Sequence, residues 1–345
     1  MKPINHLLVI RLSAMGDVAM SVPVVLALTK QYPDLQVTIL TRAFFKPLFS
    51  NLSNVKVHAA AVNDRHKGVY GLWRLYKELK LLKIDAVADI HCVLRSTVLK
   101  YCFRLADIPV IQIDKGRAEK RALTSGVAGG FKQLKSTHQR YAEVLRRLGF
   151  DVDLSKALYK AKEAVPCQFR HFIAMSGRKL IGIAPFAAFK GKTYPPHLME
   201  EVVSRLASSA KYTIVLFGGG EEQKKLLDVW EHKFSHTFST IGKATFAEEL
   251  ALISNLDVML AMDSGNAHLA AMYGVPTVTL WGVTHPYAGF APFAQPIENA
   301  LLANREIFPL IPTSVYGNKM PKGYEKAIET ISIEQILKKI KELLD

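Results

Sequence analysis

Near the N-terminus lies the stretch His6-Leu-Leu-Val-Ile-Arg-Leu-Ser-Ala-Met-Gly-Asp17, in which an apolar run is followed by a short turn. A short apolar run that ends in a turn is typical of a buried strand. From about Val18 to Gln31 the apolar residues recur at helical spacing. A strand, a turn and a helix in this order predict the first unit of a parallel α/β sheet.

The same alternation continues along the chain and restarts in its second half. Strands are predicted at residues 36–40, 85–89, 110–113, 179–184, 213–217, 258–261 and 277–280. Helices are predicted at residues 71–83, 93–105, 139–148, 197–208, 221–232, 246–254 and 267–273. The fold class is therefore expected to be α/β, with two Rossmann-like, doubly wound domains that face each other across a cleft.

The two alternations also suggest where the domains begin and end. We expect a first domain at residues 1–165 and a second at residues 175–325, with the strand-free stretch 161–177 as a hinge. Residues 332–345 read as an amphipathic helix that is expected to pack back on the first domain. In doubly wound folds ligands bind beyond the carboxyl ends of the strands, so the chemistry is sought there.

Composition limits the classes of protein to consider. The 345 residues contain no apolar run of the ~18 residues that a membrane-spanning helix needs, and the N-terminus does not resemble a signal peptide. The three cysteines form no metal-binding pattern, so neither a disulfide framework nor a metal site is expected. We therefore expect a cytoplasmic protein. The net charge of +15 indicates an anionic partner, which nucleic acid, a phosphorylated small molecule or a membrane surface would satisfy; the alternative is a basic surface that only keeps the protein soluble.

The positive charge is concentrated between residues 65 and 147. Cations in this region are expected to bind an anionic acceptor, with four of them as the candidates: Arg65, Lys67, Arg95 and Arg117.

Asp17 is an unusual residue for a turn that follows the first strand. A carboxylate there would repel a phosphate, and the stretch contains neither a dinucleotide fingerprint nor a Walker A loop. Asp17 suits a catalytic base that faces the ligand. It suits equally well an acid that stabilises the start of the following helix, a contribution of ~1 kcal/mol. Local sequence leaves these two interpretations open.

Three motifs in the second half follow predicted strands. Asp263-Ser-Gly-Asn-Ala-His268 combines a polar turn with a helix start, where backbone N–H groups favour anions, and Ser264 and His268 could donate to a diphosphate. Gly218-Gly-Gly-Glu-Glu222 would let a ligand approach the backbone, with Glu221 or Glu222 accepting from ribose. Lys192 could neutralise a departing diphosphate, and Thr284 follows the last predicted strand. In each case an ordinary cap, core or loop residue is the alternative.

Taken in order, these motifs resemble those of the ADP-heptose:lipopolysaccharide heptosyltransferases, glycosyltransferase family 9. The resemblance covers nearly the whole chain and includes Arg11-Leu-Ser-Ala-Met-Gly-Asp17, Lys192-Thr-Tyr-Pro195 and Asp263-Ser-Gly-Asn-Ala-His268. It implies a GT-B fold and an inverting transfer without a metal or cofactor, with ADP-heptose as a co-substrate. The implied catalytic residues are Asp17 and Lys192. The implied donor-binding residues are Ser13, Gly16, Glu221, Glu222, Asp263, Ser264, Gly265, His268 and Thr284.

The resemblance also implies an acceptor and a location. The acceptor would be a lipopolysaccharide inner core, either Kdo-lipid A or a heptosyl acceptor, and the enzyme would sit at the inner face of the inner membrane, held by its cations. The glycine-acid turn is one residue shorter than the common form, so either Glu could contact ribose. The alternatives are a glycosyltransferase of the same fold that uses another nucleotide sugar, or a basic nucleic-acid-binding protein. The sequence contains no nucleic-acid-binding motif, so nucleic acid is not expected as a partner.

Overall fold

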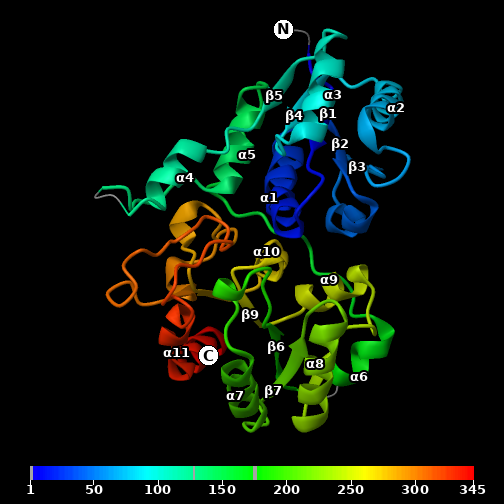
Figure 1. Cartoon of the computed structure of the whole chain (residues 1–345). Coiled ribbons are helices and arrows are strands. Elements are labelled where there is room, and N and C mark those ends of the chain that lie inside the picture. Colours follow the sequence, from blue (N-terminus) through cyan, green and yellow to red (C-terminus); the bar gives the residue numbers. More distant parts are fainter. Residues whose placement is uncertain (1–2, 127–128, 174–176) are drawn as a thin grey trace. The chain divides into compact units, whose positions relative to one another are not determined.

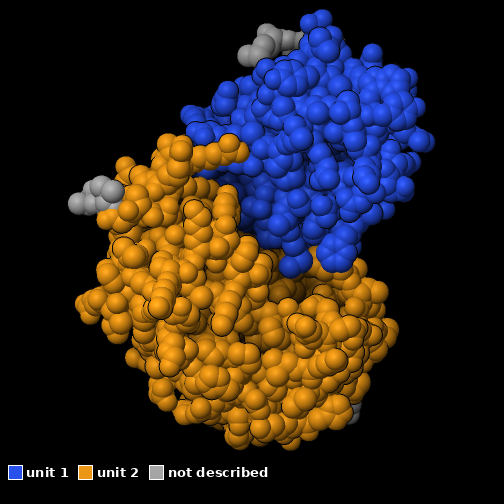
Figure 2. Space-filling model, viewed as in Figure 1, with its two compact units in different colours: residues 1–115, 137–160 blue, residues 116–136, 161–345 orange. Residues whose placement is uncertain are grey.

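The computed structural model of the chain describes residues 3–126, 129–173 and 177–345. They form two compact units, which Figure 2 shows in different colours. Unit 1 comprises residues 1–115 and 137–160, and unit 2 comprises residues 116–136 and 161–345. The predicted hinge thus begins where unit 1 ends, and its residues 174–176 lie outside the described part of the chain.

Unit 1 is built on a five-stranded sheet in the order β3-β2-β1-β4-β5, and its strand pairs are parallel. The strands are β1 (His6–Ile10), β2 (Gln36–Thr41), β3 (Val55–Ala59), β4 (Ala86–Asp89) and β5 (Val110–Gln112). The helices are α1 (Met15–Gln31), η1 (Ala43–Phe49), α2 (Gly68–Lys80), α3 (Leu94–Arg104) and α5 (Thr137–Arg146). This is the doubly wound arrangement that the alternating sequence predicts.

The helices of unit 1 lie on both faces of its sheet (Figure 1). Right-handed crossovers place α1 on one face, because the chain moves outward from β1 to β2. The chain returns from β3 to β4 and continues to β5, so α2 and α3 lie on the opposite face, where they pack side by side. Leu72, Leu75, Leu99 and Phe103 of these two helices join the buried core over the sheet.

Unit 2 contains a six-stranded sheet in the order β11-β10-β9-β6-β7-β8, again parallel. The strands are β6 (Lys179–Ala184), β7 (Tyr212–Leu216), β8 (Thr237–Ser239), β9 (Val258–Met262), β10 (Thr277–Trp281) and β11 (Ala300–Leu302). The helices are α4 (Arg117–Leu123), α6 (Arg170–Ile173), α7 (Pro196–Ala207), α8 (Glu221–Lys233), α9 (Phe246–Ser254), α10 (Gly265–Ala271) and α11 (Ile333–Leu344). Short 3-10 turns are η2 (Cys167–Phe169), η3 (Lys190–Lys192), η4 (Pro286–Ala288), η5 (Ile297–Asn299) and η6 (Ala327–Thr330).

The C-terminal helix α11 packs on unit 2, which differs from the expectation that it returns to the first domain. It lies beside α7 and over β9 and β10. Its Ile336 and Ile340 are fully buried in the core that α7 and α8 share with the sheet. Arg205 of α7 also donates to Glu334 of α11 at 3.0 Å. The part of the sheet that α7 leaves uncovered thus provides the groove that this amphipathic helix needs.

Residues 116–136 also differ from the expectation, because they belong to unit 2 and were predicted to lie in the first domain. Leu123 and Leu134 form a small apolar cluster with Ala288, against which Phe131 packs. The backbone N–H of Leu134 donates to the Tyr287 carbonyl at 2.9 Å. Apolar burial therefore holds this segment on unit 2, although it stands between two elements of unit 1 in the sequence.

The sequence did not predict the edge strands β3, β8 and β11. Each is only three to five residues long, and β3 and β11 are mostly half-buried. Such strands lack the continuous apolar run that marks a central parallel strand, because one edge or face meets water. No helix within the described ranges is long and apolar enough to cross a membrane.

Both sheets contain a topological switch point, where the strand order reverses direction. In unit 1 it lies between β1 and β4, and in unit 2 between β6 and β9. Ligands of doubly wound folds bind beyond the carboxyl ends of the strands at such points. The predicted motifs around Asp17 and Asp263 follow β1 and β9, so both motifs lie where a ligand site is expected.

Candidate functional site

The switch point of unit 2 brings together three residues that the sequence nominated separately. Lys192 stands in η3, after β6, and its Nζ lies 2.8 Å from Oδ2 of Asp263, the residue that follows β9. The same oxygen accepts a hydrogen bond of 2.8 Å from Oγ1 of Thr284, which follows β10. The Lys192 and Asp263 side chains are only 13% and 9% exposed. Asp263 therefore orients a lysine and a threonine at the edge where an anionic ligand would bind.

Close backbone packing positions Lys192. The carbonyl of Gly191 accepts from the N–H of Val283 at 3.0 Å, which ties η3 to the chain just beyond β10. A Cβ on Gly282 would lie 2.2 Å from that carbonyl, so only glycine fits there. Gly317, at φ +81°, lies under the Lys192 side chain, and a Cβ on it would lie 2.3 Å from Lys192 Cδ. Sequence reasoning missed Gly282 and Gly317, because neither stands in a recognisable turn motif.

Two buried polar atoms beside this cluster lack partners. Ser264 is the N-cap of α10, yet its side chain does not cap the helix, and its Oγ is buried without a hydrogen bond. Nδ1 of His268 is likewise buried and unpaired. Burial lowers the pKa of His268 to about 4, with a further contribution from the Lys192 charge, so the imidazole is neutral at pH 7. Buried polar groups are normally hydrogen-bonded, so these two atoms indicate a ligand site.

The glycine-rich turn after β7 places Glu221 and Glu222 at the start of α8. Both residues are exposed in the first turn of the helix, and Gly220 before them adopts φ +88°. Gln223 fastens the turn, since its Oε1 accepts from the N–H of Gly219 at 2.9 Å. Both acids thus lie at the carboxyl edge of the sheet, as predicted, and their position suits the helix dipole as well as a ribose.

In unit 1, Asp17 lies in the first turn of α1, directly beyond β1. Its Oδ2 forms an ion pair with Arg11 and accepts a weak hydrogen bond of 3.4 Å from the N–H of Ala14. Tyr141 of α5 donates to the Asp17 backbone carbonyl at 3.2 Å. The Asp17 side chain is still 27% exposed. Asp17 therefore does stabilise the helix start, and it is also held rigidly while remaining accessible to a ligand.

His91, beyond β4, lies on the other side of the same switch point. Its Nδ1 accepts a long hydrogen bond of 3.4 Å from the N–H of Leu12. Asp89, at the end of β4, accepts from the N–H groups of His91 and Cys92 at 3.0 and 2.9 Å and shapes this turn. Burial lowers the pKa of His91 to about 3, and nearby cations add to the effect, so His91 is neutral at pH 7.

The cations around His91 come from the carboxyl ends of four strands: Arg11 after β1, Arg42 after β2, Arg95 after β4 and Lys115 after β5. The Nε atoms of Arg11 and Arg42 are buried without a hydrogen-bond partner. Of this group the sequence nominated only Arg95 as an acceptor residue. Arg42 was missed because it follows a strand with no polar motif to mark it. The cluster makes this edge of the sheet suitable for an anionic ligand.

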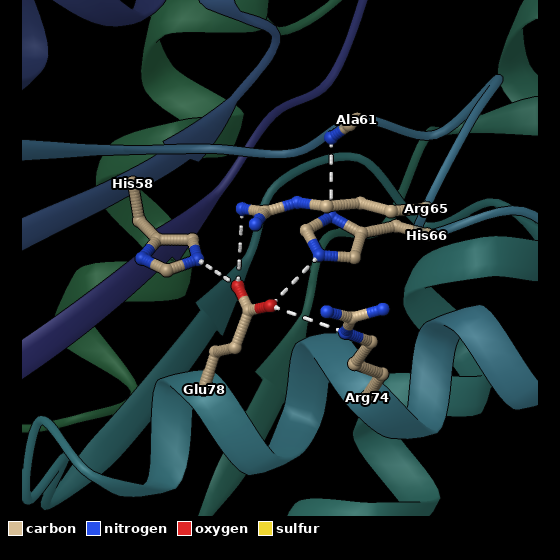
Figure 3. A network of polar contacts seen from close by, with 6 residues as sticks. All are labelled: His58, Ala61, Arg65, His66, Arg74 and Glu78. Carbon is tan, nitrogen blue, oxygen red and sulfur yellow. Dashed lines mark hydrogen bonds and ion pairs between the residues drawn. The ribbon is translucent and has the colours of Figure 1, made fainter.

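The other three predicted acceptor residues lie elsewhere. Arg117 belongs to unit 2, at the start of α4, and is exposed. Lys67 is the exposed N-cap residue of α2. Arg65 takes part in a network around Glu78 of α2, shown in Figure 3 with His58, Ala61, His66 and Arg74. The structure therefore groups Arg95 with the candidate site of unit 1, and places Arg117 on the other unit.

The network around Glu78 is a structural tie. Its carboxylate lies 3.2 Å from Nε2 of both His58 and His66 and 3.4 Å from Arg65. Burial alone would raise the pKa of Glu78, but the hydrogen bond to His66 and the charge of Arg65 outweigh it and lower the pKa. The network fastens the loop before α2, which carries Arg65 and His66, to the helix.

Ser13 and Gly16 were predicted to contact the donor, and both belong to unit 1. Both are half-buried and precede Asp17: Ser13 lies in the turn between β1 and α1, and Gly16 lies in the first turn of α1. Gly265 is the first residue of α10, next to Asp263 and Ser264 in unit 2. Among the described residues no three His, Cys, Asp or Glu side chains are grouped so that they could hold a metal ion.

Comparison with known proteins yields one family. Residues 72–320 match the model of glycosyltransferase family 9 (heptosyltransferase). The lipooligosaccharide heptosyltransferase 2 of Haemophilus influenzae is 25% identical, over 98% of this chain and 99% of that protein. The lipopolysaccharide heptosyltransferase 2 of Salmonella typhimurium is 23% identical, over 98% of both chains.

Solved structures share the fold. A family 9 glycosyl transferase from Veillonella parvula superposes with a TM-score of 0.77 at 20% identity, over 100% of this chain and 98% of that one. The ADP-heptose lps heptosyltransferase II of E. coli superposes with a TM-score of 0.69 at 18% identity, over 98% of each chain. These likenesses confirm the predicted two-domain α/β fold of the GT-B class.

Proposed function

This chain belongs to glycosyltransferase family 9, the heptosyltransferases, and we propose that it transfers heptose from ADP-heptose to the inner core of a lipopolysaccharide. The proposal includes inversion at the anomeric carbon and independence from a metal ion. The observation that carries it is the cluster of Lys192, Asp263 and Thr284 at the switch point of unit 2, with unpaired polar atoms of Ser264 and His268 beside it.

The donor is proposed to bind at this cluster. Its diphosphate would take a hydrogen bond from Ser264 and the positive charge of Lys192, which Asp263 and Thr284 hold in place. Glu221 or Glu222, at the end of the neighbouring strand, would accept from the ribose hydroxyls. As ADP leaves, negative charge grows on its terminal phosphate. A fixed ammonium group in a buried site stabilises this charge more strongly in the transition state than in the bound donor. This is the work that a metal ion performs in other transferases.

Asp17 is proposed as the general base. Both of its side-chain contacts use Oδ2, which leaves Oδ1 for an acceptor hydroxyl. In the proposed step the acceptor oxygen forms a bond to the anomeric carbon and gives its proton to Asp17. The bond between that carbon and the phosphate oxygen breaks on the opposite face, and ADP departs with the electron pair. A positioned base of this kind contributes about 10²–10⁴ to a rate.

The acceptor is proposed to be an anionic inner-core glycolipid, either Kdo-lipid A or a heptosyl acceptor. Three arginines at the sheet edge of unit 1, Arg11, Arg42 and Arg95, suit its phosphate or carboxylate groups, and two of their Nε atoms are buried without a partner. The relatives named as lipooligosaccharide and lipopolysaccharide heptosyltransferases support this class of acceptor.

Two measurements test the proposal. Thermal shift and calorimetry against ADP, UDP and GDP should show the tightest binding for ADP, and Lys192→Met should weaken the binding of ADP. A preference for UDP or GDP would reject ADP-heptose as the donor and leave the fold unaffected.

The second measurement compares Asp17→Asn with Asp17→Ala in a transfer assay. Both variants should bind ADP and lose transfer by about 10²-fold or more, because neither side chain can accept the proton. Both variants lose the ion pair with Arg11 and should be less stable than the parent. Asn can still accept at the helix start, so the Ala variant should lose about 1 kcal/mol more than the Asn variant. Transfer by Asp17→Asn at the parent rate would remove Asp17 from the mechanism.

A further inference from the structure

The outward side of α2 is unusually apolar for an exposed helix. Leu72, Leu75 and Leu79 face the core, so the opposite side of the helix faces away from the sheet. That side carries Tyr70 and Trp73, which are 77% and 44% exposed, and Leu81 directly after the helix is 82% exposed. The Nζ atom of Lys77 lies 3.7 Å from the centre of the Trp73 ring, so a positive charge lies over the face of this ring.

Helix α3 repeats this pattern. Its Leu99 and Phe103 are buried, and its outward side carries Leu94, Tyr101 and, directly after the helix, Leu105, which are 82%, 59% and 89% exposed. Because α2 and α3 pack side by side on one face of the sheet, their outward sides point the same way. Together they form one surface, which we call the α2–α3 outer face, made of Tyr70, Trp73, Lys77, Leu81, Leu94, Tyr101, Arg104 and Leu105.

The charge around this face is mostly positive, although the exposed acid Asp107 follows shortly after Leu105. Residues 68–106 contain seven cations, namely Arg74, Lys77, Lys80, Lys83, Arg95, Lys100 and Arg104. The same stretch contains three acids, Glu78, Asp85 and Asp89. Glu78 is taken up by the network of Figure 3, Asp85 accepts from the N–H groups of Asn5 and His6, and Asp89 is fully buried. The acids therefore do little to offset the cations at the surface.

We propose that the α2–α3 outer face docks on an anionic lipid bilayer. Exposed Trp, Tyr and Leu side chains interspersed with Lys and Arg are the composition of interfacial helices, whose rings and aliphatic groups enter the headgroup region while the cations meet the lipid phosphates. A protein partner would be expected to cover such apolar groups with a shaped pocket, and nucleic acid would leave Leu81, Leu94 and Leu105 without a partner. Charge complementarity therefore selects the membrane surface.

The chain supplies its own reporter for this contact. It contains three tryptophans, of which Trp230 and Trp281 are buried and Trp73 alone is exposed. Adding anionic vesicles of phosphatidylcholine and phosphatidylglycerol should shift the tryptophan emission of the intact protein to shorter wavelength, because Trp73 would enter the headgroup region. Pure phosphatidylcholine vesicles should not. The variant Trp73→Phe should bind the vesicles but lose the shift.

Co-sedimentation with the same vesicles measures the affinity. The variant Lys77→Gln with Lys80→Gln should weaken binding by about 25-fold, at about 5-fold for each cation removed near an anionic surface. The matched control Lys211→Gln with Lys225→Gln, which removes two exposed lysines from unit 2, should leave binding unchanged. Tyr70→Ser with Leu81→Ser should also weaken binding, whereas Val229→Ser on α8, 57% exposed, should not.

Several outcomes would overturn the proposal. Vesicle binding that is equal in the parent and both α2 variants would place the docking surface elsewhere, as would binding without a Trp73 shift. A concentration-dependent dimer that the α2 variants abolish would make this face a contact between two copies of the chain. Binding is measured without donor or acceptor, so a failure here would leave the proposed transfer reaction untouched, and a failure of that reaction would not alter the vesicle result.

Discussion

Replacing Lys192 by Met should separate its structural contribution from its proposed chemical one. The ammonium group lies 2.8 Å from the Asp263 carboxylate, and both side chains are largely buried. Removal of one partner from a buried ion pair leaves an uncompensated charge and costs about 3–5 kcal/mol. Thr284 still donates to Asp263 in this variant, so we expect the low end of this range, about 3 kcal/mol.

Adding Asp263→Asn to Lys192→Met removes the buried charge as well. The double variant should regain about 2 kcal/mol of the stability that Lys192→Met loses, and the single variant Asp263→Asn completes the double-mutant cycle that gives the coupling energy. Transfer activity should behave differently, because neither variant has a cation for the departing diphosphate. We therefore expect the double variant to be about 1 kcal/mol less stable than the parent and as inactive as Lys192→Met.

The assay is urea-induced unfolding followed by tryptophan fluorescence in a Trp73→Phe background. The remaining Trp230 and Trp281 are buried in unit 2, so the signal reports the unit that contains the ion pair. The control is Lys224→Met, which breaks a Lys224–Asp228 pair of 2.6 Å whose side chains are 36% and 30% exposed. Exposed pairs contribute about 1 kcal/mol or less. If Lys192→Met is no more destabilising than Lys224→Met, the reasoning about the buried pair is refuted.

Three further changes probe the same sites. Gly317→Ala should lower the transfer rate at least about 10-fold, because the added Cβ would displace the Lys192 side chain and misplaced groups lose much of their effect on a rate. The control Gly323→Ala, at φ +88° with open space around it, should cause only backbone strain. Equal activities of the two variants would contradict this prediction. His268 has a pKa of about 4 in the folded protein, so between pH 6.5 and 4 only the unfolded chain takes up a proton at this residue. The free energy of unfolding should therefore fall over this range by about 3 kcal/mol more in the parent than in His268→Gln. Parallel pH curves for the two proteins would exclude a lowered pKa at His268. Arg42→Gln should raise the KM for the acceptor but not for the donor, and steady-state kinetics that show the reverse would place the acceptor elsewhere.

The sequence predicts the central strands and the helices between them, because a strand buried on both faces must be a continuous apolar run. It fails at β3, β8 and β11, which are short, and at residues 116–136, whose attachment to unit 2 depends on a few apolar contacts such as Phe131 with Tyr287. The same limitation explains α11. Its amphipathic pattern shows that it needs a groove, but the pattern does not say which domain provides one.

The residues of the candidate site that directly follow predicted strands could be predicted from the sequence. Lys192, Asp263 and Thr284 follow three strands that are far apart in sequence and neighbours in the sheet, and the parallel topology brings their ends together. Gly317 and Arg42 were not predictable in this way. The first matters because the Lys192 side chain lies over it, and the second because it converges on His91 together with cations from three other strand ends. Both properties arise only in the folded chain.

Asp17 shows why two interpretations of one residue need not compete. As a helix-start acid it accepts from Ala14 through Oδ2, and the same oxygen pairs with Arg11. These contacts and the hydrogen bond from Tyr141 to its carbonyl fix the carboxylate in place. A general base must already be oriented when the hydroxyl arrives, since loss of position lowers its effect sharply. The capping contacts therefore support the proposed catalytic role, because they orient the carboxylate and leave Oδ1 for the acceptor.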